Sequence, residues 1–404
     1  MDGSYLDNNA TTMPAPEVLD AMDQAGRELW ANPSSVHRFG QQVRQRVELA
    51  RQSVAGLIGA APRELVFTSG GTESANLATF GLTPTPAGLT LITTGVEHAA
   101  VREPAEHVGK QGGRVVWLAV DSAGRVELDG LSEASERAIA DKDEGRGVVL
   151  VSIQWANNET GVIQPIPAIA EAVALAKATA RERGRRIKLL LHVDATQAVG
   201  KLPVDVDLVG IDLLTFSAHK FHGPKGVGAL WLRRGVRLSP LQRGGPQERE
   251  RRGGTENTTG IIGMGVAADL ARQFLDTPQN TVAIQALRDR LERGVVSALP
   301  DTVVNSRDAP RLWNTTSLGF PGVEAEAVLL GLSEKGICAS AGAACSSGSL
   351  EPSPVLLAMG IPEPVAHGSV RFSLSRYTRP SEIDRALEAV PAVVGRLMRT
   401  MPMG

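Results

Sequence analysis

Residues 65–80 read Leu-Val-Phe-Thr-Ser-Gly-Gly-Thr-Glu-Ser-Ala-Asn-Leu-Ala-Thr-Phe, and the fold class can be inferred from them. The apolar start, Leu65 to Ser69, predicts a buried strand. Two glycines then allow a tight turn, and Ser74 to Phe80 predicts the beginning of a helix. A strand that runs directly into a helix is the repeating unit of sheets with parallel strands.

The same alternation continues along the chain. Pro167 to Arg181 is rich in alanine and predicts a helix. Because strands separated by helix-length segments form largely parallel sheets with helices on both faces, we expect an α/β fold. Ligands of such sheets bind beyond the carboxyl ends of the strands. The further expected strands are Leu89–Thr93, Arg114–Ala119, Val148–Ile153, Leu189–Val193, Leu213–Phe216 and Ala229–Leu232.

The pattern changes after about residue 260. Gly263–Phe274 and Asn280–Leu299 are long amphipathic stretches, Thr315–Phe320 resembles a strand, and Ser381–Arg396 predicts a closing helix. We therefore expect a domain boundary near residue 260.

Composition excludes several classes of protein. The 404 residues are 42% hydrophobic and 21% charged, which is ordinary globular usage and unlike a disordered, collagen-like or coiled-coil chain. A net charge of -2 argues against a dedicated nucleic-acid binder. Two cysteines cannot form a disulfide framework, and we expect neither a secretory signal nor a membrane-spanning segment. We expect a reduced, cytoplasmic protein with no membrane association.

Polar residues that could bind a ligand or take part in a reaction follow several of the expected strands. Thr72, after the glycine pair, stands where a helix begins, and the free amide groups there suit a phosphate, although a simple capping turn has the same pattern. Asp194, with Gln197 three residues later, suits a protonated ring nitrogen, although an aspartate that caps a helix is common.

A lysine and an arginine extend this group. Lys220 follows the strand Leu213–Phe216 and precedes a Gly-Pro turn, which favours a desolvated amine capable of forming a Schiff base over an exposed loop lysine. Arg371 lies within a strand-like segment and needs an anionic partner if it faces inward. That partner is either a substrate carboxylate or a surface ion pair.

The two cysteines differ in context. Cys345 lies among small residues, Ala339 to Ser349, which suits a reactive thiol on a mobile loop, although a lone cysteine is more often buried and inert. We expect Cys338, after Gly336-Ile337, to pack as a small apolar side chain.

Taken together, these motifs resemble the cysteine desulfurases of the NifS/IscS group, which are class V aminotransferase-like, fold-type I enzymes that use pyridoxal 5′-phosphate (PLP). The resemblance covers nearly the whole chain, in the family's order, and rests on Tyr5–Thr12, Asn32–His37, Ser69–Ser74, Ala156–Gly161, Val193–Gln197, Ser217–Lys220, Cys345–Ser353 and Arg371–Tyr377.

The resemblance implies a fold-type I architecture with two domains. Residues 14–260 would form a large PLP-binding domain around a mostly parallel seven-stranded sheet. Residues 1–13 and 261–404 would form a smaller α+β domain that carries the catalytic cysteine and the arginine for the substrate carboxylate.

The resemblance also assigns roles on the cofactor. Lys220 would join PLP covalently and later move the Cα proton, and His98 would stack on the ring and act as acid or base. Asp194 would pair with the ring nitrogen. The remaining contacts would be Asn158 and Gln197 to the ring hydroxyl, Gly71, Thr72, Ser217 and His219 to the phosphate, and Thr255 to the phosphate of the other subunit of a homodimer.

On the substrate side, Arg371, helped by Asn32, would bind the carboxylate of L-cysteine, and Cys345 would take the sulfur as a persulfide. The product would be alanine, and the sulfur would pass to an iron–sulfur scaffold or another acceptor protein. No intrinsic metal is expected, although a cluster bound jointly by Cys345 and a scaffold remains open. The alternatives are a selenocysteine lyase or another class V enzyme, and a scaffold without activity in a sulfur-transfer complex.

Overall fold

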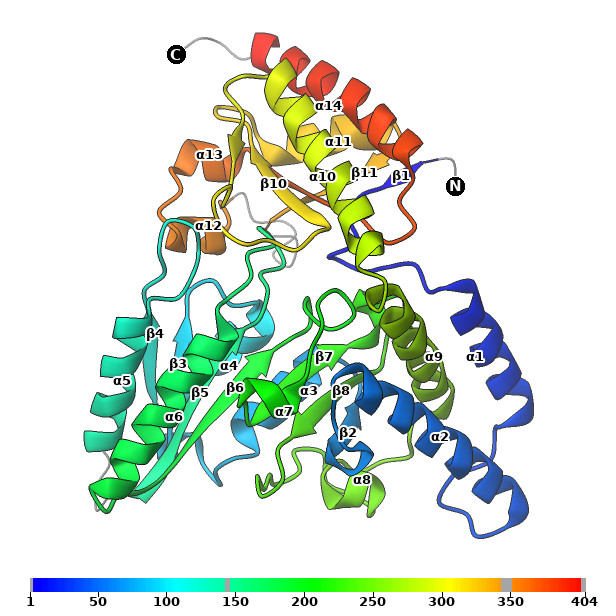
Figure 1. Ribbon diagram of the computed structural model, residues 1–404, viewed down its shortest axis with the longest axis vertical. Coiled ribbons are helices and arrows are strands. Elements are labelled where there is room, and N and C mark those ends of the chain that lie inside the picture. The colour runs from blue at the N-terminus through cyan, green and yellow to red at the C-terminus, as the bar shows by residue number, and fades with distance from the viewer. Residues whose placement is uncertain (1–2, 142–145, 343–350, 401–404) are drawn as a thin grey trace.

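The computed structural model describes residues 3–141, 146–342 and 351–400. A seven-stranded sheet with helices on both faces forms the larger part, and a smaller α+β part lies against one end of it (Figure 1). The fold class predicted from the sequence is confirmed.

The strands of the large sheet follow the order β2-β8-β7-β6-β5-β3-β4. Only β8 runs antiparallel to its neighbours; every other pair is parallel. All seven coincide with apolar runs expected to be strands: β2 (Leu65–Thr68), β3 (Leu89–Thr94), β4 (Arg114–Leu118), β5 (Arg146–Gln154), β6 (Arg186–Asp194), β7 (Leu213–Ser217) and β8 (Gly228–Leu232).

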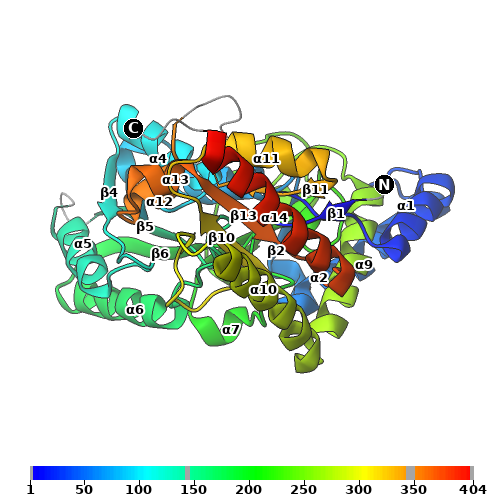
Figure 2. The ribbon, with the colours of Figure 1, turned by 90° about the horizontal axis from the view of Figure 1, so that it is seen from above.

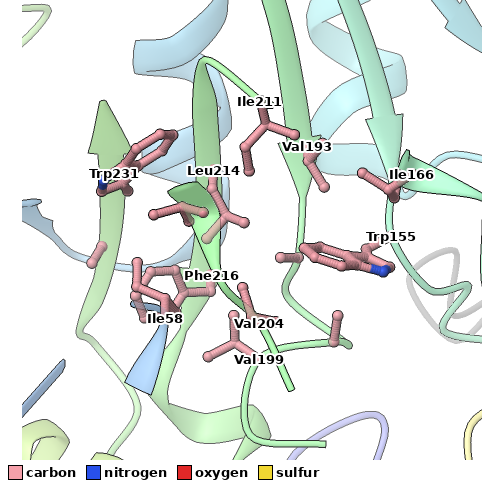
Figure 3. Close-up of a cluster of buried hydrophobic side chains, with 14 of the residues drawn as sticks. Ile58, Trp155, Ile166, Val193, Val199, Val204, Ile211, Leu214, Phe216 and Trp231 are labelled. Atoms are coloured by element: carbon pink, nitrogen blue, oxygen red, sulfur yellow. The ribbon is translucent and has the colours of Figure 1, made fainter. Parts of the chain in front are cut away.

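The two faces of this sheet pack on different sets of helices. In β2, Leu65 and Phe67 belong to one hydrophobic cluster and Val66 to another, because successive side chains of a strand point to opposite faces. The larger cluster includes Phe216 and Trp231 (Figure 3). The helices of this part are α1 (Pro16–Glu28), α2 (Arg38–Leu57), α3 (Gly71–Phe80), α4 (Ala99–Lys110), α5 (Leu128–Ala140), α6 (Ile166–Glu182), α7 (Val206–Val209), α8 (Gln247–Glu250) and α9 (Thr258–Leu275).

The smaller part has its own hydrophobic core beneath the antiparallel sheet β12-β13-β10-β9. A parallel pair, β1 with β11, brings the N-terminal segment to its edge (Figure 2). Its elements are β1 (Ser4–Tyr5), α10 (Pro278–Ala298), β9 (Val303–Val304), β10 (Thr315–Gly319), α11 (Ala325–Glu334), β11 (Ile337–Cys338), β12 (Ser340–Ala341), α12 (Pro354–Ala358), α13 (Glu363–His367), β13 (Ser369–Ser373) and α14 (Pro380–Thr400).

Helix α9 changes the expected division of the chain. Its buried residues Ile261, Met264 and Ala268 belong to the core of the larger part, where α9 packs against α1 and α2. We therefore propose a boundary between α9 and α10 in place of the one expected near residue 260. The amphipathic pattern of α9 identified a helix but could not indicate which core it joins.

Within the described ranges, none of the helices has the length and apolar character that crossing a bilayer requires.

Candidate active site

A cavity of about 270 Å³ lies at the carboxyl ends of β5, β6 and β7, next to the first turn of α3. This is the edge of the sheet where the sequence predicted a ligand. The structure brings together there nearly all of the residues expected to contact a cofactor: Gly71, Thr72, His98, Asn158, Asp194, Gln197, Ser217, His219 and Lys220.

The first turn of α3 forms one wall of this cavity. Among the described residues, no side chain caps the helix, since its N-cap residue is Gly70. A Cβ added to Gly71 would lie 3.0 Å from Thr196 Oγ1, so a larger residue there would press on the Thr196 side chain. Backbone amides at an uncapped helix start, next to Ser217, form a seat for an anion such as phosphate.

Lys220 is half-buried in the cavity, so it is not an exposed loop lysine. Its Nζ donates to the backbone carbonyls of Asn9 at 2.6 Å and Ala10 at 2.7 Å. Two carbonyls of the N-terminal segment therefore hold the amine in place.

Asp194 ends β6 and is 6% exposed. Its Oδ1 accepts from the amide of Thr196 at 3.0 Å and from Thr215 Oγ1 at 3.3 Å. No helix begins directly after it, so it is not the helix cap that the sequence also allowed. Within the described parts of the chain, Oδ2 has no hydrogen bond and is available to a cationic N–H of a ligand.

His98 and His219 face the cavity as weak bases. Burial lowers the pKa of His98, with an opposing contribution from Asp194 and a further lowering from Lys220. Because His98 Nδ1 accepts from the amide of Ala100 at 3.0 Å, its proton lies on Nε2. Burial, and then the charge of Lys220, lower the pKa of His219 to about 4. Burial therefore favours the neutral form of both rings.

Arg371 lies in β13 with its side chain 3% exposed. Nη2 donates to Asp7 Oδ1 at 2.6 Å, and Nη1 donates to the backbone carbonyl of Asn158 at 2.9 Å. Nε is buried without a partner among the described residues. The arginine is thus in a buried ion pair, which a substrate carboxylate would have to replace or share.

The family model of class-V aminotransferases matches residues 4–386. The chain belongs to this family.

Its similar relatives within the family are cysteine desulfurases. The chain is 49% identical to cysteine desulfurase 2 of Trichormus variabilis and 46% identical to the cysteine desulfurase NifS of Azotobacter vinelandii. Each match covers 98% of this chain and 94% of the relative. A solved NifS-like protein matches with a TM-score of 0.85 and 34% identity, over 98% of this chain and 100% of that one. The resemblance inferred from the motifs is confirmed: this is a desulfurase of the class-V family, whose members depend on PLP.

Two expected site residues lie away from this desulfurase's cavity. Asn32 is exposed before α2, and its side chain accepts from the amide of Ser34 at 2.8 Å. Thr255 is exposed and lines a separate cavity of about 110 Å³ beside Arg252. Their expected roles at a carboxylate and at a partner's phosphate stay predictions.

The cysteines have different outcomes. Cys345 lies outside the described residues, so its expected role stays a prediction. Cys338 is exposed, so the expectation of a packed apolar side chain was wrong. Among the described residues, the two-residue strand β11 pairs with β1 alone, and this edge position leaves the second of its side chains outside the core.

Three buried polar residues next to the cavity had no assigned role. Asn9 is 1% exposed and Lys201 is 4% exposed, and both contact Gln197. Glu97 is 1% exposed, and its Oε1 accepts from Thr94 Oγ1 and from the amide of Gln154. Burial raises the pKa of Glu97 to about 8. The available signals were the Asp-Asn-Asn run at residues 7–9 and a lysine four residues after Gln197.

Proposed function

We propose that this desulfurase converts L-cysteine to L-alanine with PLP, and transfers the sulfur to Cys345 for delivery to acceptors in iron–sulfur cluster assembly. The observation that carries the proposal is the convergence of Lys220, Asp194 and the uncapped start of α3 on one cavity. These three features offer an amine, a carboxylate and an anion seat, which are the groups needed by the aldehyde, ring nitrogen and phosphate of PLP.

When bound, PLP supplies a conjugated ring that stabilises negative charge at the substrate Cα. Lys220 would hold the cofactor covalently, and its Nζ would then remove and return the Cα proton. Asp194 would keep the ring nitrogen protonated. His98 would lie against the ring as a neutral imidazole. Asn158 and Gln197 would contact the ring hydroxyl, and Gly71, Thr72, Ser217 and His219 would hold the phosphate.

The substrate's carboxylate would bind Arg371, whose planar guanidinium can make two parallel hydrogen bonds. Asn32 would assist from a second copy of the chain, since it lies away from the cavity of its own chain. Thr255 would likewise serve the phosphate site of a partner, so we propose a homodimer.

Sulfur transfer balances without an added oxidant. The Cys345 thiolate attacks the sulfur of the substrate, an S–S bond forms, and the C–S bond breaks. The electron pair of the broken C–S bond stays with the carbon skeleton, which takes up a proton and leaves as alanine. Because persulfide chemistry requires a free thiol, we place the enzyme in the reducing cytoplasm.

The test uses the two cysteines as a matched pair. The holoenzyme is incubated with L-cysteine, alanine is quantified, and peptides that contain Cys345 or Cys338 are examined by mass spectrometry. We expect one added sulfur atom on the Cys345 peptide alone. Cys345→Ala should keep the absorbance of bound PLP and lose sulfur transfer, whereas Cys338→Ala should keep both.

Two results contradict the proposal. Bound PLP without alanine formation would indicate a scaffold. Alanine formation from selenocysteine, with none from cysteine, would indicate a selenocysteine lyase.

A further inference from the structure

Lys201 is a second lysine beside the cavity, and its amine is enclosed within the protein. It is 4% exposed, in the turn that follows β6. Nζ donates to Gln197 Oε1 at 2.5 Å and to Asn9 Oδ1 at 2.9 Å. Burial lowers the pKa of Lys201 well below its usual value, and the charges of Lys220 and Arg371 add to this effect. Burying an amine costs free energy unless the amine is hydrogen-bonded. The two acceptors offset that cost, and what the buried amine does for them is the question.

The contacts of Gln197 fix which way its amide points. The carbonyl oxygen Oε1 faces the donor Lys201, and Nε2 donates to the backbone carbonyl of Asn9 at 2.9 Å. An amide nitrogen carries two hydrogens. One is used by Asn9, and within the described ranges the other has no partner. Because Gln197 lines the cavity, this N–H is available to an acceptor there.

The contacts of Asn9 link Lys201 to the reactive lysine. The carbonyl of Asn9 accepts from Lys220 Nζ at 2.6 Å. The side chain of Asn9 is held by Lys201 at Oδ1 and donates from Nδ2 to the carbonyl of Asn158 at 3.0 Å. Lys201 therefore contacts Gln197, which lines the cavity, and Asn9, whose backbone carbonyl accepts from Lys220.

We propose that Lys201 is a positioning residue that keeps the Gln197 amide turned so that its N–H points to an oxygen of the bound cofactor, the ring hydroxyl of PLP. The inference rests on the proposed function, because it requires PLP in this cavity. Lys201 donates to Gln197 Oε1 whether its amine is charged or neutral, so the arrangement does not depend on pH. Without it, Oε1 is buried with no donor, and the amide loses one of its two constraints.

The experiment compares PLP with its analogue that lacks the ring hydroxyl. Affinities of the full-length, cofactor-stripped chain for both compounds are measured by fluorescence titration, for the wild type, Lys201→Met and Gln197→Ala. We expect Lys201→Met to weaken PLP binding by about 3- to 10-fold, as for the loss of one hydrogen bond. Binding of the analogue should change little. The double variant should be no worse than Gln197→Ala, since both act on one contact.

Two further variants separate positioning from folding. Lys201→Gln keeps an N–H donor and should recover part of the preference for PLP. Lys188→Met removes a lysine from the opposite end of β6 and should leave both affinities unchanged. Thermal unfolding of each variant checks that the fold is intact.

Equal losses of affinity for PLP and for the analogue in Lys201→Met would overturn the inference, because a merely structural lysine has that effect. Affinities for both compounds that stay at the wild-type level would overturn it as well. If the wild-type chain binds neither compound, the proposed function itself fails. The two failures are therefore distinguishable.

Discussion

The two sides of the cavity are held by different kinds of contact. On the proposed cofactor side, Asp194 ends β6 and Lys220 comes shortly after β7, and the pairing of β6 with β7 places Asp194 opposite Thr215. On the proposed substrate side, Arg371 belongs to the smaller part and contacts Asp7, which is 364 residues away in sequence.

This difference separates what each side depends on. The cofactor side is set by local chain geometry and by neighbouring strands of one sheet. The substrate side exists only when β13, the N-terminal segment and the loop after β5 are assembled together. Changes on the first side should affect the chemistry itself, and changes on the second should affect substrate affinity.

The largest effect is expected on the cofactor side. Lys220→Ala removes the amine proposed to hold PLP and to move the Cα proton, so alanine formation should fall by about a thousandfold or more. Lys225→Ala is the matched control, because Lys225 is exposed in the same loop, and it should retain activity. Steady-state rates of alanine formation measure both. Activity of Lys220→Ala near the wild-type level would remove the basis of the cofactor side.

An intermediate effect is expected on the substrate side. Arg371→Lys keeps a positive charge but loses the paired hydrogen bonds, so KM for L-cysteine should rise by roughly 10- to 100-fold. The affinity for PLP should not change. Arg379→Lys changes an arginine whose side chain is 74% exposed, and it serves as the control. A loss of PLP together with the rise in KM would show that the two sides are not separable.

The smallest effect concerns stability on the cofactor side. Burial raises the pKa of Glu97 from 4.5 to about 8, so between these values the native state holds more protons than the unfolded state. Stability contributed by this group therefore falls as pH rises through that range. Relative to the wild type, Glu97→Gln should gain about 3 kcal/mol of stability as pH rises from 5 to 8, measured by urea unfolding.

The control for this measurement is Glu103→Gln, since Glu103 is an exposed carboxylate on the neighbouring helix. Its stability difference from the wild type gives the background against which the Glu97→Gln difference is compared. A difference for Glu97→Gln that stays flat with pH against this background would show that Glu97 ionises normally in the native protein.

The cofactor side was the part that sequence could predict. Asp194 and Lys220 follow apolar runs of strand length, and the carboxyl ends of parallel strands meet at one edge. Thr72 follows a glycine pair at a helix start. Each signal is contained within about ten residues, so no tertiary information is needed to find it.

The contacts between distant segments could not be predicted in this way. The network of Asn9 and Lys201 depends on an N-terminal segment that reaches the ends of β6 and β7, which no local pattern encodes. Likewise, the pattern of α9 predicts a helix with an apolar face but not the core that receives it. The pairing of Arg371 with Asp7 was open for the same reason, since an inward arginine indicates an anion without identifying it.

The N-terminal segment has a consequence for biosynthesis. The amide of Asn9 donates to Ser373 Oγ, a contact between residues 364 positions apart. During translation this segment leaves the ribosome long before β13 does, so it cannot yet make its contacts with β13. The site as described can close only after nearly the whole chain has emerged, so the proposed vitamin-derived cofactor would reach its final geometry only after synthesis.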